Sequence, residues 1–143
     1  MYVPDPELDR AIDELVRLLR PGGRLVLFEL DYGGTILPAG GHGDAIVRHV
    51  NELLDDSLPQ PRAGRRIPGL LSDRGLLDVE AHPFSFAVHE PVWRRIHDTL
   101  LASTREGDGL DPSARSWLDD QSEAATRGAF LAAFSGILTT ARI

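Results

Sequence analysis

Two carboxylates and a phenol stand at the end of a short apolar run. Residues 24–30, RLVLFEL, place Glu29 just inside the run, and Asp31 and Tyr32 follow it directly. A carboxylate buried in a strand needs a partner, and without one it becomes basic enough to act as a general base, whereas at a sheet edge it is simply solvated. Asp31 could orient or deprotonate a nucleophile, or it could make an Asx turn at the start of a loop.

Other side chains that could do chemistry are histidines and arginines. The five histidines, at positions 42, 49, 82, 89 and 97, form no HxH or HExxH pattern, so we expect no metal site. The histidines are interpreted as ordinary polar residues; His42, in a glycine-rich stretch, is the one candidate for an acid or base, because imidazole titrates near neutral pH. Arg65 and Arg66 are adjacent, and a guanidinium there could bind an acidic small molecule or cap the preceding helix.

Helix and strand patterns must position these residues. Residues 6–19 have apolar side chains at helical spacing, after Asp5 as N-cap, and the Pro-Gly-Gly of 21–23 ends this helix. The run 24–30 is typical of a buried strand, and 31–43 has the five glycines of a loop. A second helix is predicted at 44–57.

The rest of the chain continues the alternation of helices and strands. We expect a loop at 57–69, a short helical pattern at 68–75 ending at Gly75, and a strand at 76–90. Pro83 removes a backbone donor, which predicts an edge or bulged position for that strand. Two helices are expected at 91–105 and 112–128, with Trp93 and Trp117 in the core, and a final strand at 129–143 paired with 79–88.

Composition limits the possible partners. The chain has 143 residues, a net charge of −7 and no cysteine, and its apolar stretches are shorter than a membrane span needs. The acidic field disfavours a nucleic-acid partner, and the acidic start does not resemble a signal peptide. We therefore expect one domain of a cytoplasmic protein with no membrane or nucleic-acid partner.

The segment PDPELDRAIDELVRLLRPGGRLVLFELDYG resembles the part of class I S-adenosylmethionine-dependent methyltransferases in which a helix leads through an LRPGG turn into the fifth strand. GRRIPGLLSDRGLLDVEAHP is similar to the family's next helix and sixth strand, and the last helices and strand resemble its closing hairpin. The resemblance implies an α/β fold. It would be a partial Rossmann-like sheet of the last three strands, with the final strand antiparallel, flanked by about five helices.

The resemblance also implies a function. The chain would be a small-molecule methyltransferase, or part of one, that uses S-adenosylmethionine. It would contribute the acceptor side, with Asp31 and His42 as catalytic candidates and Glu29, Tyr32, Arg65 and Arg66 as candidates for binding the acceptor. The family's acidic-Gly-x-Gly-x-Gly cofactor turn does not occur in the sequence, so cofactor binding by the chain alone is not expected.

A different reading is a non-catalytic interaction module derived from such an enzyme. In the intact family the fifth strand is interior, so here it would present bare backbone groups along an apolar edge. We expect a homodimer or other homo-oligomer, or a partner chain, to pair with that edge.

Overall fold

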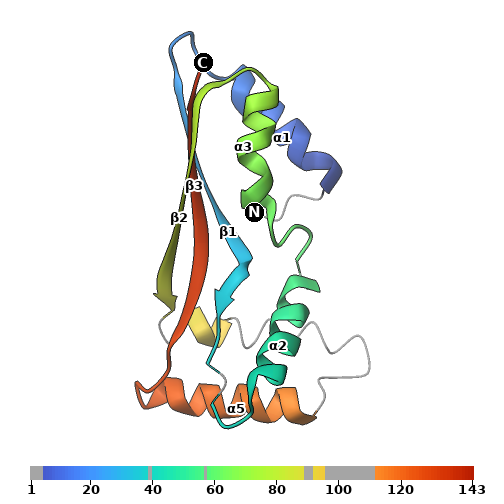
Figure 1. Ribbon diagram of the computed structural model, residues 1–143, viewed down its shortest axis with the longest axis vertical. Helices are drawn as coiled ribbons and strands as arrows, with labels where there is room; N and C mark the ends of the chain where they lie inside the picture. Colours follow the sequence, from blue (N-terminus) through green and yellow to red (C-terminus); the bar gives the residue numbers. More distant parts are fainter. Residues whose placement is uncertain (1–4, 39, 57, 89–91, 96–111) are drawn as a thin grey trace. The chain divides into compact units, whose positions relative to one another are not determined.

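The computed structural model describes residues 5–38, 40–56, 58–88, 92–95 and 112–143. They form a mixed α/β structure with one three-stranded sheet (Figure 1). The chain divides into two compact units, which are described separately below. Of the described residues, the first unit takes in 5–33, 58–85 and 135–143, and the second takes in 34–38, 40–56, 86–88, 92–95 and 112–134.

The sheet consists of β1 (Arg24–Ile36), β2 (Leu77–Val88) and β3 (Ala132–Arg142), in the order β1-β3-β2. β3 runs antiparallel to both of its neighbours (Figure 1). The predicted pairing of the last strand with residues 79–88 is confirmed. The predicted edge position is confirmed too, because β2 is an outer strand and tolerates the missing backbone donor of Pro83.

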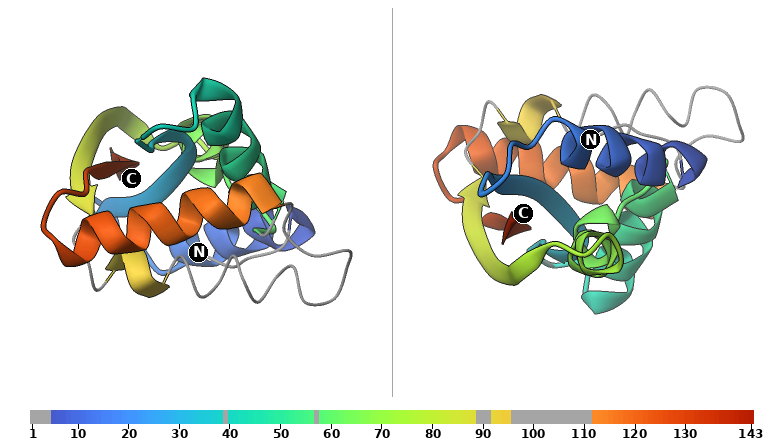
Figure 2. Two further views of the ribbon diagram at one scale, coloured as in Figure 1. Left: turned by 90° about the horizontal axis from the view of Figure 1, so that it is seen from below. Right: turned by 90° about the horizontal axis from the view of Figure 1, so that it is seen from above.

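Two helices of the first unit pack on one face of the sheet. They are α1 (Asp5–Arg17) and α3 (Ala63–Asp73), which contact each other (Figures 1 and 2). The predicted apolar face of α1 forms, because leucines and isoleucines at helical spacing meet those of α3 and the inward residues of the strands. The buried members of this core are Leu8, Ile12, Leu25, Ala63, Ile67, Leu71, Leu76 and Ala141.

The C-terminal end of α3 is fixed by a glycine and an arginine. Gly75 has φ of +77°, and the Gly75 and Leu76 N–H groups donate to the carbonyls of Ser72 and Leu71, as the predicted C′ glycine should. Arg74 donates from Nε to Asp13 Oδ1 of α1 at 2.5 Å. That hydrogen bond raises the pKa of the Arg74 guanidinium above its ordinary value, and it joins the two covering helices.

The second unit has its own core. α2 (Asp44–Asp56) contacts α5 (Pro112–Thr126), and residues 92–95 are also helical. Trp93 and Trp117 are buried and meet edge to face, with ring centroids 5.7 Å apart. Both tryptophans are therefore core residues, as the sequence predicts.

The structure corrects two predicted boundaries. β1 does not stop at residue 30 but continues through the predicted loop as far as Ile36, and α3 begins at Ala63 inside the predicted loop 57–69. The early start of α3 has a packing cause. Ala63, Gly64 and Ile67 are buried against the sheet, so tertiary contacts extend the helix upstream of Pro68.

Some predictions concern residues outside the described part of the chain. They are His89, His97 and most of the helix expected at 91–105. Among the described residues, no helix is both long and apolar enough to cross a bilayer.

Candidate functional site

Glu29 and Asp31 lie on the helix-covered face of β1. Side chains alternate along a strand, and the odd-numbered residues of β1 point toward the covering helices. Both carboxylates are buried, at 5% and 8% exposure. The expectation that Glu29 would be solvated at an edge strand is therefore wrong. β1 is an outer strand, but Gly64 of α3 lies over it, close to the Glu29 Cβ, and keeps water from that face.

Asp31 is paired with Arg65. The Arg65 Nε lies 3.0 Å from both Asp31 carboxylate oxygens, and a terminal guanidinium nitrogen lies 2.9 Å from Oδ2. The Asp31 side chain is 11% exposed, whereas that of Arg65 is 51% exposed. The buried Asp31 carboxylate thus fixes the orientation of the Arg65 guanidinium. The solvent-exposed side of the guanidinium can bind a second anion.

A glycine makes room for this arrangement. A Cβ on Gly33 would lie 2.8 Å from the Arg62 Nε and 2.9 Å from an Arg65 terminal nitrogen. The Tyr32 N–H also donates to the Pro61 carbonyl at 3.0 Å, which ties the end of β1 to the segment before α3. Gly33 is therefore a strand glycine required by close approach, and the predicted flexible loop is wrong at this point.

Tyr32 and Arg66 lie next to Asp31 and Arg65 in the sequence. Tyr32 is half-buried and follows Asp31 in the strand, so its side chain leaves from the opposite face of β1. Arg66 donates to the Gln60 side chain at 3.0 Å and lies 3.8 Å from an Asp9 oxygen. The contacts of Arg66 with Gln60 and Asp9 thus differ from the contact of Arg65 with Asp31.

His42 belongs to the second unit and has an acidic partner. Its Nε2 lies 2.8 Å from Asp120 Oδ2, with the imidazole 21% and the carboxylate 61% exposed. A pocket of about 420 Å³ is lined by His42, Ala45, Ile46, His49 and Ser113. A carboxylate on one ring nitrogen can fix the tautomer of the imidazole. Sequence reasoning missed Asp120 because 78 residues separate it from His42.

No described group of three histidine or acidic side chains could hold a metal ion. The contact of His82 with Glu80, at 3.3 Å, is a surface pair on β2.

No protein-family model matches the chain, and no curated protein matches it either. The methyltransferase resemblance therefore depends on the sequence motifs.

Proposed function

We propose that the chain forms the acceptor side of a class I methyltransferase that acts on a small molecule. The main support is the order of elements. α1 precedes β1 and is joined to it by the LRPGG turn, α2 and α3 lie between β1 and β2 in the chain, and the final strand β3 is antiparallel in the sheet. This is the arrangement that the resemblance implies for the last three strands of a Rossmann-like sheet.

The position of the Asp31–Arg65 pair supports an acceptor site. Open α/β sheets bind ligands at the carboxyl ends of their strands, and Asp31 lies in the C-terminal half of β1. Arg65 can bind a carboxylate of the acceptor through its exposed side, while Asp31 keeps the guanidinium oriented. Methyl transfer mainly requires alignment of the nucleophile, so a bound and oriented acceptor is the chain's contribution.

The residues present do not fit S-adenosylmethionine. The sequence has no acidic-Gly-x-Gly-x-Gly turn, and the space beside Gly33 in the C-terminal half of β1 is filled by Arg62 and Arg65. We therefore assign no cofactor-binding residues to this chain. If a partner segment binds S-adenosylmethionine next to this site, the cofactor would supply the methyl group.

Ligand-observed NMR with the isolated chain tests the proposal. The probes are small molecules that carry a carboxylate together with a hydroxyl or amine nucleophile. We expect binders whose affinity falls about tenfold in Arg65→Gln, because a charge-assisted hydrogen bond is lost. Arg17→Gln is the matched control, since Arg17 forms an exposed pair with Glu14 at 2.9 Å. A lack of binders, or equal affinity for Arg65→Gln and the unmodified chain, would reject the proposal that this chain binds the acceptor.

A calorimetric titration tests the role of the cofactor separately. The isolated chain should show no micromolar binding of S-adenosylmethionine. Micromolar binding would mean that this chain contains a cofactor site that its sequence does not reveal.

A second candidate function is a non-catalytic module that oligomerises or binds a partner chain. The observation that favours it is the outer position of β1, whose second edge has no strand partner among the described residues. Pairing at that edge should protect further β1 amides from hydrogen exchange on association. Unchanged exchange would reject this pairing mode.

A further inference from the structure

One face of the sheet in the first unit is covered by helices, and the opposite face carries exposed apolar side chains. We call this opposite surface the open face and define it by Val26 and Phe28 of β1, Gly136 and Thr140 of β3, and Phe84 of β2. Val26 is 61% exposed, Phe28 49% and Phe84 44%. Exposed aromatic and branched side chains gathered on one sheet face are typical of an interaction surface.

The aromatic rings of the open face are already ordered. Phe28 and Phe84 stack across the central strand, with centroids 5.5 Å apart and ring planes at 27°. Gly136 allows this contact, because a Cβ there would lie 2.4 Å from a Phe28 ring carbon. Two rings fixed before association lose less side-chain entropy on binding.

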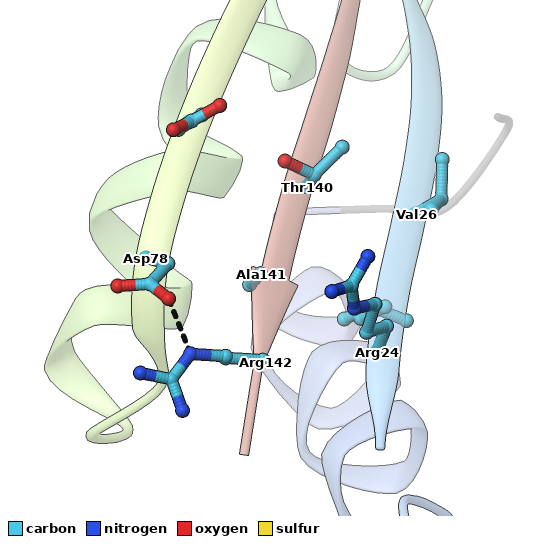
Figure 3. Close-up of a pocket in the computed structure, with 8 residues that line it drawn as sticks. Arg24, Val26, Asp78, Thr140, Ala141 and Arg142 are labelled. Carbon is cyan, nitrogen blue, oxygen red and sulfur yellow. Dashed lines mark hydrogen bonds and ion pairs between the residues drawn. The ribbon is translucent and has the colours of Figure 1, made fainter. Parts of the chain in front are cut away.

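Charged residues lie at one end of the open face. A pocket of about 280 Å³ there is lined by residues of all three strands (Figure 3). Arg24 projects from β1, whereas Asp78 and Glu80 belong to β2, and Asp78 pairs with Arg142 of β3. At this end of the open face, β1 therefore carries the Arg24 guanidinium, whereas β2 carries two carboxylates, of which Asp78 pairs with Arg142 and Glu80 contacts His82.

We propose that the open face binds a second copy of this chain around a two-fold axis that runs along β3. Such an axis places β1 of one copy over β2 of the other. Arg24 then faces the partner's Asp78 and Glu80, and Phe28 faces the partner's Phe84. The same contacts occur twice, as a closed two-fold interface requires.

Charge complementarity favours a second copy over an unrelated chain. The two outer strands carry opposite charges at the same end of the face, so the surface complements itself after the rotation. Two sheets packed in this way would form an aligned sandwich with their rings in the middle. The proposal does not depend on a methyltransferase function.

Sedimentation of the full chain over a concentration series tests the proposal. We expect a reversible dimer at twice the 15.7 kDa chain mass. Phe28→Gln and Phe84→Gln should each weaken the dimer about tenfold or more, since aromatic residues dominate such interfaces. Leu18→Gln is the control, because Leu18 is 68% exposed but follows α1, outside the open face. A monomer throughout, or a dimer that neither phenylalanine variant weakens, would overturn the proposal.

A charge exchange tests the direction of the axis. Arg24→Glu and Glu80→Arg should each weaken the dimer several-fold at low salt, and the double variant should restore affinity. Restoration cannot arise from damage to the fold. Failure of the double variant to recover would reject the proposed axis.

Cross-linking gives a third measurement that does not depend on affinity. The sequence has no cysteine, so Thr140→Cys introduces one thiol on the central strand, close to the proposed axis. A short bis-maleimide should link two copies of Thr140→Cys and should not link Ser72→Cys, a control on the exposed side of α3. Equal linking of both variants would contradict the face-to-face arrangement.

Discussion

The two faces of the sheet in the first unit are formed by the same strands but differ in how deeply their side chains are buried. On the helix-covered face, Leu25 and Ala141 belong to a dry core, and the same face of β1 buries Asp31. On the open face, Val26 and Phe28 alternate with them and remain half exposed or more. The comparison shows that a side chain of β1 is buried because α1 and α3 cover its face of the sheet, and not because of its position along the strand.

The largest expected effect comes from removing a core side chain on the covered face. Ile67→Ala should lower the free energy of unfolding by about 2–5 kcal/mol, because Ile67 is 1% exposed and its loss leaves a cavity. Phe28→Ala, at a concentration where the chain is monomeric, should cost less than about 1 kcal/mol. Urea unfolding followed by circular dichroism measures both. Equal losses would mean that the open face is packed as tightly as the covered one.

A smaller effect is expected from releasing the covering helices. Arg74→Met should cost about 1–3 kcal/mol, because it removes the hydrogen bonds from α3 to Asp13 and to the Asp9 carbonyl of α1. Arg17→Met should cost less than about 0.5 kcal/mol, since its partner Glu14 is exposed. The same unfolding measurement applies. A cost for Arg74→Met no greater than for Arg17→Met would show that the link does not hold α1 in place.

The ion pair at the end of the covered face should contribute less again. A double-mutant cycle with Asp31→Asn and Arg65→Gln should give a coupling energy of about 1 kcal/mol, because half of the Arg65 side chain is in water. The free energies of unfolding of the two single variants and the double variant supply the cycle. Strictly additive losses would show that the pair is not formed in solution.

The smallest change is expected on the open face itself. Gly136→Ala should alter the free energy of unfolding by no more than about 0.5–1 kcal/mol, since the half-exposed Phe28 ring can rotate away from the new methyl group. The ring stack with Phe84 should nevertheless be lost, which NMR ring-current shifts would show. Unchanged shifts would contradict the close approach of Phe28 to Gly136.

Local sequence patterns were sufficient for much of the fold. The apolar spacing of α1, the glycine that ends α3 and the pairing of the last strand were all predicted, because each depends on neighbouring residues or on simple alternation. The length of β1 was not predictable in this way. Gly33 indicates a loop until the guanidinium groups of Arg62 and Arg65, which come from a distant segment, are known to lie against it.

The candidate site was predictable only as separate residues. Asp31, Arg65 and His42 were singled out by type and position, but their partners are 34 and 78 residues away in sequence. Local patterns along a sequence do not indicate which distant residues pair, because such pairs form only when the whole chain folds. The structure also places Asp31 and His42 in different units, so their catalytic roles remain separate predictions.

The central place of β3 has a consequence for how the chain acquires its structure. β1 and β2 each pair with β3 and not with each other, although β3 follows both of them in sequence. Neither earlier strand can satisfy its backbone in this sheet until residues 132–142 have been synthesised. Such non-local pairing slows folding. Until β3 is available, the unpaired β1 and β2 segments can bind chaperones or aggregate.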